Sequence, residues 1–104
     1  MLETSGIARG MYELGALVVD LDSYSARLDG HDLEISGSQL ELLAVLIANK
    51  HRVMDRDELA KMLGLQHART VDVLLSSLRH RIGREFVRNV RSRGWIIDAT
   101  AFAS

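Results

Sequence analysis

The chain has 104 residues and a formal net charge of −1, which fits one domain with a single modest hydrophobic core. It contains no cysteine, which excludes disulfide bonds and thiolate metal sites. No apolar run reaches the roughly 18 residues that cross a bilayer, and the first residues lack the apolar segment of a signal peptide. The composition therefore predicts a soluble protein of the cytoplasm with no membrane association.

The charge is unevenly distributed along the chain. Residues 1–68 carry 6 basic and 11 acidic side chains, whereas residues 69–93 carry 7 basic and 2 acidic ones. All seven basic residues of the second segment are arginines, whose planar guanidinium can bind phosphate through two parallel hydrogen bonds. The pattern predicts an anionic partner on one side of the domain, although the same arginines could simply solvate a surface.

The first part of the chain is predicted to form a tail followed by a small sheet. Residues 1–10 are small and polar, which is typical of a flexible tail or linker, and we expect the domain to span residues 11–100. Residues 11–35 hold short β-rich runs separated by turn signals, including the dipeptide Asp29-Gly30 of type I′ hairpins. They predict an antiparallel sheet of three or four strands.

Two helices are expected next. The first covers residues 37–49, which are apolar on most faces, and Ser36 opens it with the capping pattern S-x-x-Q. The second covers residues 56–63, because Asp55 and Glu58 repeat the capping spacing ahead of an amphipathic run.

A third helix, over residues 67–82, has two different faces. At about 100° per residue its apolar stripe comprises Val71, Leu74, Leu75, Leu78 and Ile82. The opposite face carries Arg69, Thr70, Val73, Ser76, Ser77 and His80. A solvated face would carry Glu and Lys pairs instead. Short polar side chains and an exposed valine can contact phosphates, base edges and thymine methyls, so this face predicts a helix that enters the DNA major groove.

Residues 85–98 contain two β-rich runs separated by RSRG, which predicts a hairpin with an arginine-loaded tip. Arg91 and Arg93 are two residues apart, so we expect them on the same side of an extended chain, with Arg88 nearby. Such a loop can reach a minor groove, where negative potential favours guanidinium groups.

The order of these elements predicts an α+β fold. An antiparallel sheet comes first, three helices follow, and a C-terminal β-hairpin wing ends the domain. The tight connection between the second and third helices is typical of a helix-turn-helix, in which the second helix of the pair reads the groove. The predicted architecture is a winged helix-turn-helix.

The run RTVDVLLSSLRHRIG followed by VRNVRSRGWII resembles the signature of the OmpR/PhoB-type winged-helix domain, the DNA-binding output module of many bacterial response regulators. Upstream, LDGHDLEISGSQLELLAVLIANKHRVMDRDELA is also similar to that family, so the resemblance covers about residues 14–97. It implies a four-stranded N-terminal sheet, three helices and a wing. It also implies dimeric binding to repeated DNA sites and a phosphorylated receiver domain upstream.

The resemblance also assigns roles to individual residues. Arg69 and Thr70 match positions that touch the sugar–phosphate backbone, and Arg79 matches a phosphate or base contact. Asn89 and Arg91 match wing positions at the backbone and the minor groove. Together with the residues chosen from the pattern, the expected DNA-binding set is Arg69, Thr70, Val73, Ser76, Ser77, Arg79, His80, Arg88, Asn89, Arg91 and Arg93.

Some positions depart from the family pattern. Ser76 and Ser77 stand where many members have basic side chains. Val73, in contrast, matches a family position that meets a base methyl. The connection GLQHA between the second and third helices is shorter than the usual loop. In several members that loop contacts RNA polymerase, and its short form here weighs against such a partner.

Two classes of function stay open. The first is sequence-specific binding of double-stranded DNA by a bacterial transcriptional regulator. The second is a winged-helix module repurposed for protein–protein interaction or for regulating an attached enzyme domain, which the uncharged Ser76 and Ser77 favour. An enzyme is not expected, because the chain has no phosphate-binding glycine loop and no nucleophile motif. The four histidines are scattered, so we expect neither a metal nor another cofactor.

Overall fold

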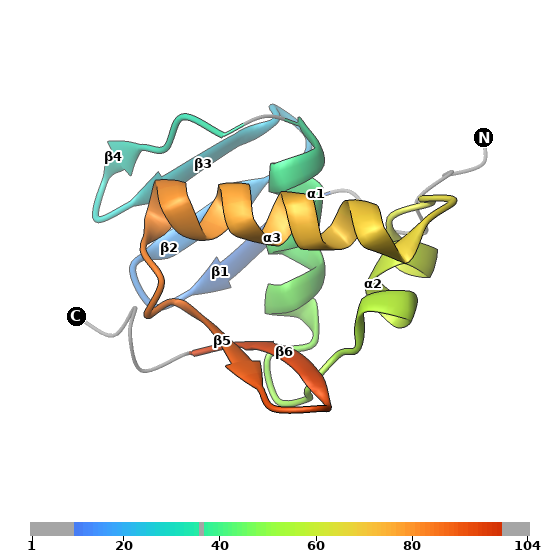
Figure 1. Cartoon of the computed structure of the whole chain (residues 1–104). Helices are drawn as coiled ribbons and strands as arrows, with labels where there is room; N and C mark the ends of the chain where they lie inside the picture. The colour runs from blue at the N-terminus through green and yellow to red at the C-terminus, as the bar shows by residue number, and fades with distance from the viewer. Residues whose placement is uncertain (1–9, 36, 99–104) are drawn as a thin grey trace.

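The computed structural model describes residues 10–35 and 37–98 of the chain. This part forms a four-stranded sheet, three helices and a two-stranded hairpin (Figure 1), which confirms the predicted α+β class. The elements are β1 (Met11–Leu14), β2 (Leu17–Asp20), β3 (Ser25–Leu28), β4 (His31–Asp32), α1 (Gly37–Ala48), α2 (Arg56–Met62), α3 (Ala68–Ile82), β5 (Val87–Val90) and β6 (Gly94–Ile97). Except for Gly10, the predicted tail lies outside the described residues, and so does the Ser36 cap.

The N-terminal sheet has the strand order β1-β2-β3-β4, and each strand pairs antiparallel with the next. The connection from β3 to β4 is the expected tight turn, because Asp29 and Gly30 both have positive φ, 54° and 79°. Tyr24, just before β3, donates its hydroxyl hydrogen to the Glu41 carboxylate of α1 at 2.6 Å. The sheet is thus tied to the first helix by a side-chain contact as well as by apolar packing.

Helix α1 lies at the centre of the core. The sheet, α2, α3 and β6 all contact it, which explains why its sequence is apolar on most faces rather than along one stripe. The largest fully buried side chains come from α1 itself, β2, the segment before α2, α2 and α3: Leu17, Val19, Leu42, Leu43, Val45, Leu46, Met54, Leu59, Val71, Leu75 and Leu78.

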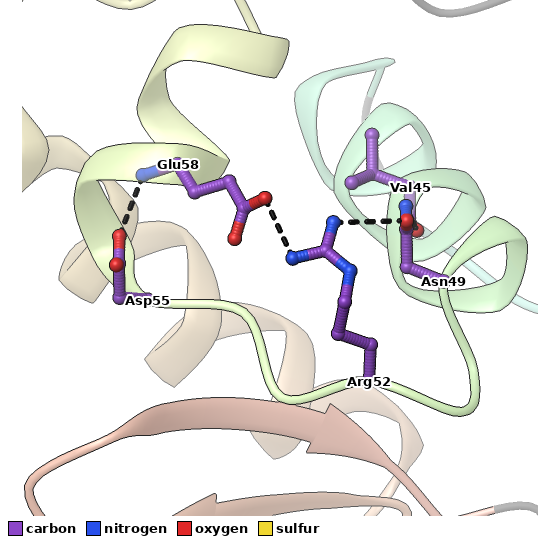
Figure 2. A network of polar contacts seen from close by, with 5 residues as sticks. All are labelled: Val45, Asn49, Arg52, Asp55 and Glu58. Carbon is purple, nitrogen blue, oxygen red and sulfur yellow. Dashed lines mark hydrogen bonds and ion pairs between the residues drawn. The ribbon is translucent and has the colours of Figure 1, made fainter.

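A polar network fixes the start of α2 against the end of α1 (Figure 2). The Asp55 carboxylate accepts the Glu58 backbone N–H at 2.8 Å, which is the predicted cap and contributes about 1 kcal/mol in typical helices. The Glu58 carboxylate pairs with Arg52 Nη1 at 2.7 Å, and Arg52 Nη2 donates to Asn49 Oδ1 at 3.2 Å. Asn49 Nδ2 donates to the Val45 carbonyl at 2.9 Å, which completes the link to α1.

Candidate nucleic-acid interface

Helix α3 separates a buried stripe from an exposed polar face, as the sequence predicts. The buried side chains are Val71, Leu75, Leu78 and Ile82, and Leu74 is half-buried beside them. The exposed side chains of the opposite face are Arg69, Thr70, Val73, Ser76, Ser77 and His80. Val73 is 64 % exposed, and among the described residues it is one of three large hydrophobic side chains that lie exposed. An apolar side chain on this polar face is therefore available to a partner.

The turn before α3 is short and well defined. Residues 63–67 connect the two helices, and Gly64 adopts a positive φ of 70° directly after α2. The Gly64 N–H donates to the Lys61 carbonyl at 3.2 Å, and the Leu65 N–H donates to the Ala60 carbonyl at 2.8 Å. These are the two hydrogen bonds of a Schellman motif, which ends α2 and redirects the chain. Helix α2, this turn and α3 form a helix-turn-helix.

The tip of the hairpin is a tight turn over residues 91–93. The Arg93 N–H donates to the Val90 carbonyl at 2.9 Å, and Ser92 has a positive φ of 64°. The expectation that Arg91 and Arg93 lie in extended chain is wrong, because both belong to this turn, where the alternation of sides that holds within a strand does not apply. Both arginines are nevertheless exposed at the tip.

Two backbone hydrogen bonds fasten the wing to the segment that precedes α2. The Met54 N–H donates to the Trp95 carbonyl and the Trp95 N–H donates to the Met54 carbonyl, each at 2.8 Å. The approach is this close because Gly94 has no side chain. A Cβ at Gly94, whose φ is 140°, would overlap the Met54 carbonyl and lie 2.8 Å from the Asp55 Cα. The wing therefore has a fixed position beside the helix-turn-helix.

Arg88 and Asn89 lie on β5 and are exposed. The Asn89 amide nitrogen donates to the Gly94 carbonyl at 3.1 Å, across the hairpin. One hydrogen of this amide, which was predicted to face DNA, is thus engaged in closing the wing.

Arg79 is held between the helix and the wing. Its guanidinium carbon lies 5.1 Å from the centroid of the Trp95 ring, within the range of a cation–π interaction. Among the described residues its Nε is buried and has no hydrogen-bond partner. The Trp95 ring itself is half-buried and packs against the core. Arg79 therefore connects α3 to the wing, in addition to its predicted role at phosphate.

Three shallow hollows in the described part of the chain join the exposed face of α3 to the wing. The first lies on α3 and is lined by Asp72, Val73, Ser76, Ser77 and His80. The second shares Asp72 and Ser76 with the first and extends to Trp95. The third shares Asp72 and Trp95 with the second and reaches Arg93 at the wing tip. The two predicted surfaces are therefore continuous, and Figure 1 shows the hairpin below α3 in this view.

Two arginines on this surface were missed by the sequence analysis. Arg56 lines the third hollow, and its Nη1 lies 3.2 Å from Asp72 Oδ2 of α3. Arg84 lines the second hollow, in the loop after Gly83. Arg56 directly follows the cap of α2, the first helix of the helix-turn-helix, and that helix lies near the DNA backbone in such motifs. Its position in the sequence could therefore have predicted it as an interface residue.

The described residues form neither a candidate metal site nor a helix that could span a membrane. Within residues 10–35 and 37–98, no three His, Asp or Glu side chains gather in a way that could hold a metal ion. In the same part of the chain, no helix combines the length and apolarity needed to span a membrane.

The fold and the surface define a winged helix-turn-helix domain, and comparison with known proteins gives its family. Residues 30–97 match the family described as "Transcriptional regulatory protein, C terminal". The match covers more than half of the chain, so this chain belongs to that family of OmpR/PhoB-type domains.

Known relatives are bacterial regulators. The chain is 28 % identical over 102 residues to the response regulator protein PmrA of Pseudomonas aeruginosa, covering 94 % of this chain and 46 % of PmrA. It is 26 % identical over 106 residues to the transcriptional regulatory protein PhoP of Escherichia coli K12, covering 94 % of this chain and 48 % of PhoP. The chain thus spans about half the length of these curated relatives.

Solved structures share the architecture. The DNA-binding domain of Klebsiella pneumoniae RstA in complex with the RstA box is similar with a TM-score of 0.75 and 26 % identity, covering 86 % of this chain and 97 % of that one. The DNA-binding domain of CpxR from E. coli is similar with a TM-score of 0.71 and 25 % identity, covering 84 % of this chain and 94 % of that one.

Proposed function

We propose that this chain is the sequence-specific, double-stranded DNA-binding domain of a bacterial transcriptional regulator. Helix α3 would enter the major groove and the arginine-tipped wing would reach an adjacent minor groove. The continuity of the exposed face of α3 with the wing tip carries the proposal. Membership of the family and the likeness to RstA, solved with its DNA box, support it.

The side chains divide into two groups by chemistry. Arg69, Arg88, Arg91 and Arg93 are exposed guanidinium groups suited to phosphates and to the minor groove, with Thr70, Arg79 and Asn89 as further backbone contacts. Val73, Ser76, Ser77 and His80 form the part of the surface that can face base edges. Affinity would come mainly from the first group and sequence preference from the second.

The full protein would be larger than this chain. The curated relatives are about twice as long, and we propose a receiver domain upstream whose phosphorylation controls DNA binding. Such a regulator works in the cytoplasm, where the bacterial chromosome lies. The short turn of residues 63–67 offers little surface for RNA polymerase, so we propose no contact there.

The protein-interaction alternative is less well supported. It was motivated by the uncharged Ser76 and Ser77, but Arg69 on α3 and the wing arginines are exposed around them. Measured affinity separates the alternatives, because non-specific DNA binders typically reach a Kd of about 10⁻⁴–10⁻⁶ M at physiological salt. Millimolar or weaker binding to every duplex tested would favour the interaction module.

Arg91→Ala and Ser76→Ala should impair binding in different ways. Loss of one phosphate contact lowers the slope of log K against log salt by about 0.9 and weakens binding to all sequences equally. Loss of a hydroxyl that faces base edges should leave the slope unchanged and alter the ranking of duplexes. Fluorescence anisotropy at several salt concentrations, with duplexes selected from a random pool, measures both quantities.

Arg27→Ala is the matched control for Arg91→Ala. It removes the same charge from β3 of the N-terminal sheet, where the exposed Arg27 pairs with Asp32 at 3.2 Å and lines none of the three hollows. Equal slopes for the two variants would contradict the assignment of the wing to DNA.

A further inference from the structure

The second hollow, between α3 and the wing, contains an arginine that neither the sequence pattern nor the family resemblance assigns. We infer that Arg84 and Arg79 together bind one phosphodiester group of the duplex in this hollow. The inference rests on the proposed function and adds a contact from the loop that joins α3 to the wing. Besides these two arginines, the hollow is lined by Asp72, Leu75, Ser76 and Trp95.

The loop that carries Arg84 is held at both ends. The Gly83 N–H donates to the Arg79 carbonyl at 2.9 Å, and the Phe86 N–H reaches the Gly83 carbonyl at 3.4 Å. The Phe86 carbonyl accepts the Asp98 N–H at 2.8 Å, and the Phe86 ring packs against the core. Gly83 has a φ of 111°, and a Cβ there would lie 2.9 Å from the Phe86 ring. The backbone of Arg84 is therefore placed by its neighbours, although its side chain is exposed.

Arg79 is also oriented before any ligand arrives. The Trp95 ring lies 5.1 Å from its guanidinium carbon. Its Nε is buried without a hydrogen-bond acceptor among the described residues. A guanidinium fixed in this way loses little conformational freedom when it binds phosphate. Trp95 acts here as a positioning residue, since it holds Arg79 at the edge of the hollow.

The charge of the hollow favours an anion. Arg79 and Arg84 supply two positive charges, and the acid that lines the same hollow, Asp72, is already paired with Arg56 at 3.2 Å. Glu85 follows Arg84 in the loop and is exposed, but it does not line the hollow. The volume of the second hollow is about 190 Å³, several times the ~30 Å³ that a water molecule occupies in the liquid. The hollow therefore has room for a phosphate group.

Two arginines near the end of α3 allow a matched test. Arg84→Ala should lower the salt slope of duplex binding by about 0.9 and weaken binding to all sequences by the same factor. Arg81→Ala removes the same charge three residues away, but Arg81 Nη1 lies 4.0 Å from Glu34 of the N-terminal sheet region and does not line the hollow. We expect the slope of Arg81→Ala to equal that of the unchanged protein. Equal slopes for Arg84→Ala and Arg81→Ala would overturn the inference.

The single tryptophan supplies a second, direct measurement. Trp95 is the chain's one tryptophan and lines the hollow, so its fluorescence should change as duplex binds, with the same Kd as anisotropy gives. Circular dichroism checks that both variants are folded. Salt-dependent binding by the unchanged protein without a change in Trp95 emission would overturn the inference and leave the proposed function standing. Absence of duplex binding by the unchanged protein would overturn both.

Discussion

Replacing Gly94 with alanine is expected to displace the wing and to destabilise the domain by about 3 kcal/mol or more. The added Cβ would overlap the Met54 carbonyl, so the pair of hydrogen bonds between Met54 and Trp95 could not form at their present length. The φ of 140° is an additional strain for any residue with a side chain. Urea denaturation gives the loss of stability. Trp95 emission and duplex anisotropy show whether the wing has moved and binding has weakened with it.

Gly30→Ala is the control for this substitution. Gly30 also has a positive φ, 79°, but a Cβ there would meet nothing within 4 Å. Its variant should lose about 1–2 kcal/mol from backbone strain alone and keep full affinity for DNA. If Gly94→Ala lowers the free energy of unfolding no more than Gly30→Ala does, and binds duplex normally, then close docking of the wing against Met54 is not needed for the interface.

Leu78→Ala should have the second large effect, a loss of about 2–5 kcal/mol of stability. Leu78 is fully buried at the centre of the α3 stripe, so truncation leaves a cavity among packed side chains. Molecules that remain folded should still bind duplex normally, because the exposed face of α3 is unchanged. Thermal or urea denaturation, combined with anisotropy well below the midpoint, separates the two effects.

Ser77→Ala is the neighbouring control on the opposite face. Ser77 is exposed and lines the first hollow, so its variant should keep its stability within about 0.5 kcal/mol and change duplex preference instead. Reversal of the two results, with Ser77→Ala unfolding the protein and Leu78→Ala leaving it stable, would mean that α3 presents the other face to DNA.

The features that the sequence predicts well are those with a local physical cause. The apolar stripe of α3 repeats at helical spacing, the Asp55 cap has a fixed offset to Glu58, and Asp29-Gly30 suits a turn with two positive φ values. Each pattern involves residues close in the chain. The three helices and the β3–β4 hairpin could therefore be predicted without knowledge of tertiary contacts.

Contacts between distant segments could not be predicted in this way. The ion pair of Arg56 with Asp72 and the stacking of Arg79 on Trp95 depend on how α2, α3 and the wing are placed relative to one another. The RSRG tip of the hairpin was predicted, but the positive φ of Ser92 within it was not, because serine does not mark such a position as glycine does. The sequence could therefore assign interface residues to α3 and to the wing, but only the structure shows which of them contact one another.

Backbone amide chemical shifts during titration with a selected duplex test most directly whether α3 and the wing form one DNA-binding surface. We predict that the largest changes fall in residues 69–80 and 84–95, with little change in the sheet over residues 11–32. Changes concentrated in that sheet, or confined to α3 or to the wing alone, would contradict a single interface made by both.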